Sequence, residues 1–255
     1  MKRMKNPLSK DVSQIITNFK DYFIKNCTKS QAEEQGKVIH DFIEGVIENL
    51  PKHSLWKNSK AEELEEAYEY IEKFLMKELF SVCFSTTKEL KDKDKEISDK
   101  IQKVQWVSPE NLEIRPQHQS EKKFNMAITE LKKIDGYYSP RDKMTCILNC
   151  CKTLYSILNF ASKSGFPSGA DEFLPLLIYV VIRANPQRFQ SNIDYIQNFR
   201  KPNKLITESG YYLTNYVAAV SFIESIDASS LKISPEEFER YMNENASKQL
   251  VAAVP

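Results

Sequence analysis

Two adjacent carboxylates, Asp171 and Glu172, are the residues whose types and position best suit chemistry on another molecule. They follow a small, flexible turn that contains Pro167 and Gly169, and an almost wholly apolar run, residues 173–182, begins directly after them. A run of that composition and length predicts a buried helix. We therefore expect an acidic tip on a rigid base, which is how a protein points one carboxylate at a target.

Local chemistry alone favours an ordinary role for Asp171. An aspartate at the start of a helix usually caps backbone N–H groups or complements the helix dipole. Pro175 has a similar explanation, because a proline early in a helix removes only an N–H that has no intrahelical partner. Arg183 and the Asn185-Pro186 pair predict where this helix ends. These features do not name a function.

The sequence offers little support for metal or thiol chemistry. His40, His53 and His118 lie far apart and beside no cysteine pattern, so no spacing resembles a zinc site. Cys150 and Cys151 are adjacent and would point in different directions on a helix, which favours core thiols over a redox pair. A Cys–His nucleophile pair stays open but has no support. The cysteines are Cys27, Cys83, Cys146, Cys150 and Cys151. We expect them to be reduced thiols, and we expect no metal and no cofactor.

Phosphate and carboxylate chemistry give equally weak signals. The chain has no Gly-rich phosphate loop, so it is not predicted to be a P-loop nucleotide hydrolase. Asp142, Asp171 and Glu172 could supply paired carboxylates, but without the signature of a substrate pocket this is a weak enzyme hypothesis.

Composition bounds the class of protein. The chain has 255 residues, 28% of them charged, with a formal net charge of +1. This balance argues against nucleic acid as the main partner, because no basic excess exists to neutralise phosphates. Few glycines and plentiful Leu, Ile, Glu and Lys favour helices. No apolar run is long enough to span a bilayer, and we expect no signal peptide at the amino terminus.

Three segments before residue 80 carry apolar residues at helical spacing, and they begin near Asp11, Ser30 and Ser59. Ser59 and Glu62 form a candidate capping box for the third segment. Consecutive amphipathic helices with short connections predict an antiparallel bundle.

Further helices are predicted from the caps and apolar spacing that follow. The charge-dense stretch 89–103 mixes both signs, which favours a solvated loop and helix surface, and its short apolar stripe could pack on the bundle. Ser139-Pro140 predicts the start of a long helix, and Ser234-Pro235 predicts a final short one. No run alternates with period two, so we predict an all-α fold. The expected domains are a bundle over 1–105, a layered helical domain over 106–228, and a C-terminal helix and tail over 229–255.

A set of motifs in a fixed order gives this fold a family. Together they resemble the Vps-nine (vacuolar protein sorting nine) domain, and the helices before them resemble the bundle that precedes it in Rabex-type and plant-type members. Of the two, the resemblance to the plant-type member is the closer. The motifs are Ser139-Pro-Arg-Asp-Lys143, Cys146-Ile-Leu-Asn-Cys-Cys151, Gly169-Ala-Asp-Glu-Phe-Leu-Pro175, Ala184-Asn-Pro186, Gln190-Ser-Asn-Ile193 and Gly210-Tyr-Tyr-Leu-Thr-Asn215.

The resemblance implies a guanine-nucleotide exchange factor for small GTPases of the Rab-five class. In that family the acid that matches Asp171 is the catalytic carboxylate. Pro175, Tyr211 and Thr214 match residues that bind the GTPase. Many members have two prolines after the asparagine of the Asn-Pro motif, whereas Gln187 follows Pro186 here.

The resemblance also implies partners and a place in the cell. The expected partner is a Rab-five-class GTPase, bound most tightly when it is free of nucleotide, with no nucleic acid and no direct membrane insertion. We expect a cytoplasmic protein, recruited peripherally to early endosomes or related trafficking membranes, that makes no covalent bond to its partner. The alternative is a non-catalytic GTPase-binding helical adaptor module, and a metal- or thiol-dependent enzyme is a third class.

Overall fold

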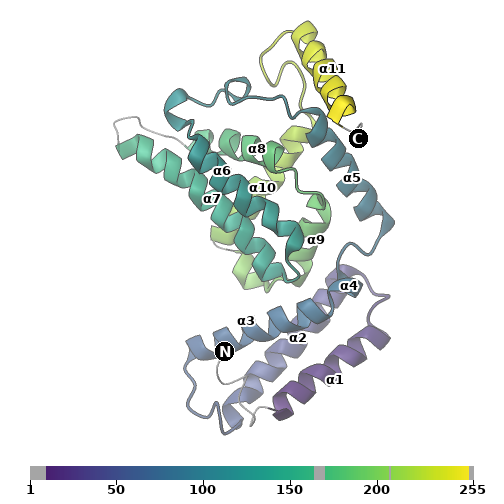
Figure 1. Ribbon diagram of the computed structural model, residues 1–255. Coiled ribbons are helices and arrows are strands. Elements are labelled where there is room, and N and C mark those ends of the chain that lie inside the picture. The colour runs from purple at the N-terminus through teal and green to yellow at the C-terminus, as the bar shows by residue number, and fades with distance from the viewer. Residues whose placement is uncertain (1–9, 164–169, 207, 253–255) are drawn as a thin grey trace.

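The computed structural model is helical throughout the residues that it describes, which are 10–163, 170–206 and 208–252 (Figure 1). The turn around Pro167 and Gly169 lies outside these residues. The α-helices are α1 (Lys10–Asn26), α2 (Ala32–Asn49), α3 (Ala61–Glu78), α4 (Phe80–Cys83), α5 (Lys88–Lys103), α6 (Glu121–Lys132), α7 (Pro140–Lys163), α8 (Phe173–Ala184), α9 (Phe189–Phe199), α10 (Glu208–Glu224) and α11 (Pro235–Ala252). The 3-10 helices are η3 (Leu50–Lys52), η4 (Glu110–Leu112), η5 (Pro116–His118), η6 (Lys133–Gly136), η7 (Ala170–Glu172) and η8 (Pro202–Leu205). No strand occurs in this part of the chain, and the all-α prediction is confirmed.

Helices α1 to α4 form a bundle with its own apolar core at one end of the molecule, drawn in purple and blue in Figure 1. Helices α1, α2 and α3 each contribute a buried stripe at helical spacing, which is why the amphipathic pattern of this region gives a bundle, and the short α4 adds Cys83. Its most completely buried side chains include Phe23, Ile39, Ile43, Ile71 and Leu75. The predicted N-terminal bundle is therefore present.

The second core gathers α5 to α10 around α8. Eight of the twelve residues of α8 are buried, so this helix lies among other helices rather than at the surface. Asn185, with φ of 43°, ends α8 in the left-handed conformation that asparagine tolerates. Helix α7 begins as its cap predicts, because the Ser139 hydroxyl accepts a hydrogen bond from the Asp142 N–H at 3.1 Å. The layered helical domain expected after the bundle is thus present.

Helix α9 belongs to both cores. Its residues Ile193 and Ile196 are buried in the second core, whereas Tyr195 and Phe199 are buried in the bundle core. A Cβ atom on Gly36 of α2 would lie only 2.0 Å from the carbonyl oxygen of Asn198. Helix α2 therefore meets the end of α9 backbone to backbone, and only glycine fits at this contact.

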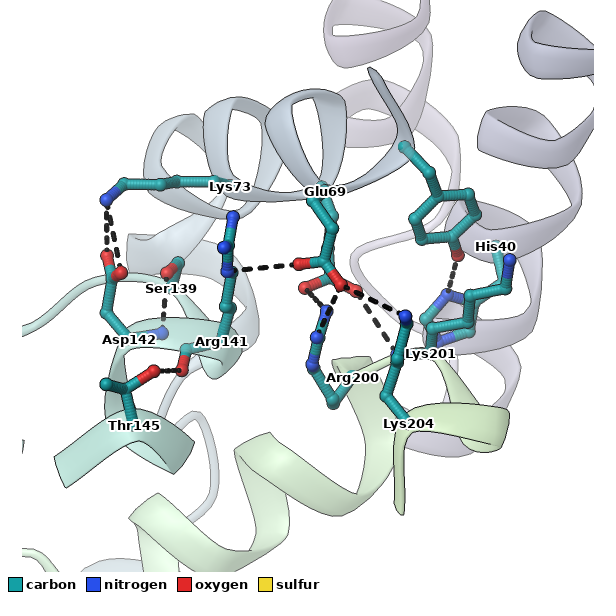
Figure 2. Close-up of polar contacts among 12 residues, drawn as sticks. His40, Glu69, Lys73, Ser139, Arg141, Asp142, Thr145, Arg200, Lys201 and Lys204 are labelled. Carbon is teal, nitrogen blue, oxygen red and sulfur yellow. Dashed lines mark hydrogen bonds and ion pairs between the residues drawn. The ribbon is translucent and has the colours of Figure 1, made fainter. Parts of the chain in front are cut away.

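A cluster of ion pairs also joins the bundle to the second core, and we call it the ionic junction (Figure 2). The Arg200 guanidinium at the end of α9 lies 2.7 Å from Glu72 and 2.6 Å from Glu69, both on α3. Glu69 also accepts from Arg141 Nε at the start of α7, at 3.1 Å. Lys73 of α3 lies 2.9 Å from Asp142. Carboxylates of the bundle therefore bind cations of two helices of the second core.

One expectation about the charge-dense stretch 89–103 was wrong, because its apolar stripe does not pack on the bundle, whereas most of its charged side chains are exposed as predicted. It is helix α5, and its apolar stripe (Ile97, Ile101, Val104) is buried in the second core rather than on the bundle. Asp94 is also buried, because its carboxylate accepts from the backbone N–H of Ser191 at 3.0 Å and from the Ser191 hydroxyl. It caps the first turn of α9 from another helix. Asp94 is thus the exception to the solvated surface that the mixed-sign pattern predicts.

Two helix ends differ in detail from the prediction. Helix α3 starts one residue later than the capping box of Ser59 and Glu62 implied, since the Glu63 carboxylate accepts from the Lys60 N–H at 3.0 Å. The final helix, expected to be short, runs for 18 residues as α11. Its cap is as predicted, because Ser234 and Glu237 exchange side-chain and backbone hydrogen bonds.

Candidate functional site

Asp171 lies at the surface, in the 3-10 turn η7 that continues directly into α8. Its side chain is exposed, and no side chain or backbone N–H within the described residues donates a hydrogen bond to its carboxylate. The adjoining Phe173 is fully buried, so the exposed acid stands two residues from the core. The buried helix behind an acidic tip is therefore as predicted, and its carboxylate is open to a partner molecule.

The neighbouring acid, Glu172, faces the protein instead. One of its oxygens lies 2.9 Å from Arg115 Nη1, and the other lies 3.8 Å from Nε2 of the buried His118. These contacts fasten η7 to the loop that precedes α6. The two adjacent carboxylates thus have different roles. Glu172 holds the turn in place, whereas Asp171 stays exposed at the surface.

Four aromatic residues, Tyr155, Phe173, Tyr211 and Tyr212, join the start of α8 to α7 and α10, and we call them the aromatic cluster. The Phe173 ring stacks on Tyr155 with centroids 4.4 Å apart, and Tyr212 packs 5.7 Å from Tyr155. The hydroxyls of Tyr155 and Tyr211 lie 3.0 Å apart. Burial and this hydrogen bond raise the pKa of Tyr155, so it stays a neutral phenol.

The remaining predicted site residues lie close to this cluster along the chain. Tyr211 is exposed over 46% of its surface and lies on α10, as does Thr214 three residues later, so both occupy one helix face. The Thr214 hydroxyl donates to the Gly210 carbonyl at 2.9 Å, a bond back to its own helix that helical threonines often make. Pro175 is the third residue of α8, where its missing N–H costs nothing. Their contact with a GTPase stays a prediction.

Sequence reasoning missed Tyr155 and Tyr212 as parts of the site. Tyr155 sits in the apolar stripe of α7 and looked like ordinary packing, although it is the residue through which Phe173 and Tyr211 are connected. A local signal existed for Tyr212 only, because it directly follows a motif tyrosine. The contacts that unite the cluster join residues far apart in the chain, and helical spacing does not report them.

The thiols are all inside the protein. Cys27, Cys83, Cys146, Cys150 and Cys151 are free and buried. Burial raises the pKa of the Cys146 and Cys151 thiols to about 12, which opposes the thiolate that a nucleophile needs. The prediction of core thiols is confirmed. Among the described residues, no three His, Cys, Asp or Glu side chains are grouped as metal ligands would be.

Comparison with known families assigns the chain. Residues 124–228 match the family model described as the Vacuolar sorting protein 9 (VPS9) domain, and residues 10–80 match the model described as Domain of unknown function (DUF5601). The chain is a VPS9-domain protein, as the resemblance of its motifs predicted. The two matches fall on the second core and on the bundle, respectively.

Similar proteins are known from plants and animals. The chain is 39% identical over 246 residues to the Vacuolar protein sorting-associated protein 9A of Oryza sativa subsp. japonica, across 95% of this chain and 51% of that protein. The Arabidopsis thaliana protein of the same name is also 39% identical, across 95% of this chain and 47% of that protein. The Rab5 GDP/GTP exchange factor of Homo sapiens is 38% identical over 221 residues, which cover 84% of this chain and 44% of that protein. The chain spans about half the length of the relatives it matches.

In the part of the chain that the structure describes, no helix combines the length and the apolar character that crossing a membrane requires.

Proposed function

We propose that this chain is a guanine-nucleotide exchange factor, which accelerates GDP release from a Rab5-class GTPase in endosomal or vacuolar trafficking. The VPS9 match and the similarity to a Rab5 GDP/GTP exchange factor support the class of activity. The observation that carries the mechanism is the exposed carboxylate of Asp171, which has no partner among the described residues, at the tip of a buried helix.

The mechanism follows from what holds a nucleotide in a GTPase. The phosphates are bound by Mg²⁺ and by a P-loop lysine. The Asp171 carboxylate, inserted into that site, offers the lysine an anionic partner and repels the phosphates by like charge. No covalent bond forms. By linkage, the exchange factor binds the nucleotide-free GTPase most tightly and leaves when a nucleotide rebinds.

The aromatic cluster gives the carboxylate its position. Tyr211 is exposed on α10 and is hydrogen-bonded to Tyr155, which stacks on Phe173 at the base of the acidic turn. A GTPase that contacts Tyr211 and Thr214 would therefore meet Asp171 in a fixed relation to them. Pro175 would stiffen the first turn of α8 behind it. Recruitment to early endosomes or related membranes would then come through partners rather than through insertion.

The test is the release of labelled GDP from a Rab5-class GTPase by catalytic amounts of the chain. Asp171→Asn keeps the shape of the side chain and removes its charge, and we expect release to slow by about a hundredfold, as when one preorganised electrostatic group is lost. Glu239→Gln removes an exposed carboxylate of α11 and should leave release unchanged.

Two other results would point elsewhere. A wild-type chain that binds the GTPase without accelerating release would be the non-catalytic adaptor module. Release by Asp171→Asn at the same rate as the wild type would show that the Asp171 carboxylate is not part of the mechanism, while the exchange activity itself would stand.

A further inference from the structure

Two glycines on opposite faces of α2 differ in a way that the fold explains for only one of them. Gly36 must be glycine because the Asn198 carbonyl of α9 occupies the space of a Cβ atom. Gly45, nine residues on, has nothing within 4 Å of where its Cβ would be. Glycine inside a helix costs stability, and it commonly marks a place where another backbone or ligand approaches closely. Nothing in the described fold makes that approach to Gly45.

Gly45 lies in a groove between α1 and α2 whose lining is apolar except for Asp11, Asp41, Asn49 and His53. The groove has a volume of about 480 Å³, and we call it the outer groove. Phe19 of α1 stacks on Phe42 of α2 beneath it, with ring centroids 3.7 Å apart. Its apolar lining comprises Val12, Ile15, Phe42, Gly45, Val46 and Leu50. A hollow with an apolar floor between two helices has the form of a site that accepts a third helix.

The two rims of the outer groove have different chemistry. On α1, Ile15 lines the groove and Tyr22 lies seven residues further along the same helix face, and they are 50% and 55% exposed. On α2, Asp41 lines the groove, and Glu34 and Glu48 lie seven residues before and after it along the helix; all three are exposed. No basic side chain in the described ranges forms an ion pair with any of these three carboxylates.

We propose that the outer groove binds an amphipathic, basic helix of a partner protein. The partner's apolar residues, at positions i, i+3, i+4 and i+7, would cover Ile15, Phe42 and the open space at Gly45. Lysines or arginines at seven-residue spacing would face the carboxylate row of α2. Glu34 and Glu48 are fourteen residues apart, so the row is about 21 Å long and fits a helix of about four turns.

This surface is separate from the proposed exchange site. Gly36 and Gly45 point to opposite sides of α2, and the Gly36 side contacts α9, so the outer groove faces away from the second core. In Figure 1, α1 lies at the edge of the bundle away from the helices of the second core. The partner helix and a GTPase at Asp171 could therefore bind at the same time. The groove would recruit the protein without blocking exchange.

The experiment is a selection from a displayed library of 18-residue helical peptides. Apolar positions are varied among Leu, Ile, Phe and Met, and the charged row is either Lys/Arg or Glu. The full chain is the bait, and Gly45→Leu is the counter-selection. Leucine has open space at this position and favours helix, so the variant should fold and fill the groove. We expect basic helices to be enriched and acidic ones to be depleted.

The best peptide is then titrated by fluorescence anisotropy against point variants. Gly45→Leu and Asp41→Lys should each weaken binding by about tenfold or more, because one fills the groove and the other reverses a facing charge. Glu33→Lys is the matched control, since Glu33 is an exposed acid of the same helix outside the row. The affinity of this variant for the peptide should stay within about twofold of the wild-type affinity. GDP release should be the same with and without saturating peptide.

Three results would overturn the proposal. The first is a library with no basic helix enriched over the Gly45→Leu bait. The second is reversible dimerisation of the wild type that Gly45→Leu abolishes, because the occupant would then be a second copy of the chain. The third is peptide binding that emerges only after residues 1–9 are removed, because the chain's own basic amino end would then be the occupant.

Discussion

The acidic turn and the ionic junction both depend on carboxylates, but one carboxylate is exposed and the other is buried. At the acidic turn, Asp171 is exposed and has no partner among the described residues. At the ionic junction, Glu72 is fully buried and lies 2.7 Å from Arg200. Burial raises the pKa of Glu72, whereas the guanidinium opposes that shift. One region leaves a charge available to another molecule, and the other uses charges to join two cores.

Because of this difference, substitutions in the two regions should have different effects. A buried charge depends on its partner, so removing the partner leaves an uncompensated ion and lowers stability. An exposed, unpaired charge contributes little to stability, so removing it should affect only what the charge acts on. Substitutions in the junction should therefore change the free energy of unfolding, and substitution of Asp171 should change exchange.

The largest expected effect on stability is at Arg200. Arg200→Met removes the cation that neutralises Glu69 and Glu72, and we expect a loss of about 3–5 kcal/mol in the free energy of unfolding. Urea unfolding followed by circular dichroism measures it. Lys232→Met is the control, because Lys232 pairs with Glu113 at 2.7 Å but both side chains are exposed. Its loss should be at most about 1 kcal/mol. Equal losses in the two variants would contradict the comparison.

The two glycines of α2 test the close contact between α2 and α9, because substitutions at Gly36 and Gly45 should change stability in opposite directions. Gly36→Ala places a methyl group against the Asn198 carbonyl and should destabilise the protein by about 1–3 kcal/mol, since backbone must move to admit it. Gly45→Ala meets no atom within 4 Å and should stabilise by about 0.5–1 kcal/mol through helix propensity. Thermal unfolding of both variants checks the opposite signs. A stabilising Gly36→Ala would mean that α2 and α9 are not in close contact.

A smaller effect is expected from Lys143, which is buried where the two cores meet. Its Nζ donates to the Ile134 carbonyl at 2.8 Å and to Asn192 Oδ1 at 2.7 Å, and it lies 4.6 Å from the Phe84 ring centroid. Burial lowers the pKa of Lys143 from 10.5 to about 8. Between these values the unfolded chain binds more protons than the folded one, so this residue's contribution to stability rises with pH.

The measurement is the free energy of unfolding of the wild type minus that of Lys143→Met, taken at several values between pH 8 and 10.5. The difference should rise by at most about 1.4 kcal/mol per pH unit. Subtracting the variant removes the titration of the buried thiols and phenols, which acts in the opposite direction. A difference that is flat or falls with pH would show that Lys143 is charged without penalty in the folded protein.

What the sequence could predict was local. The apolar run before Arg183, the Ser139 cap and the two flanking carboxylates gave α7, α8 and the acidic turn nearly as the structure has them. Composition and spacing also gave an all-α fold with a bundle first. Each of these depends on residues within one or two helical turns of one another.

What the sequence could not predict depends on long-range contacts. Asp94 caps a helix 97 positions away, and Arg200 pairs with Glu69 across 131 positions. A mixed-charge segment looks the same whether one of its acids is solvated or buried. The hydrogen bond between Tyr155 and Tyr211 likewise joins two helices whose apposition no local pattern encodes. The division of the carboxylates between an open acid and a buried junction became visible only in three dimensions.

The most direct measurement is the rate of GDP release from a Rab5-class GTPase with wild-type chain and with Asp171→Asn, alongside the urea midpoint of both proteins. We predict a midpoint that stays nearly unchanged and a rate that falls by about a hundredfold. Release as fast as that of the wild type from a folded Asp171→Asn protein would contradict the claim that this carboxylate displaces the nucleotide.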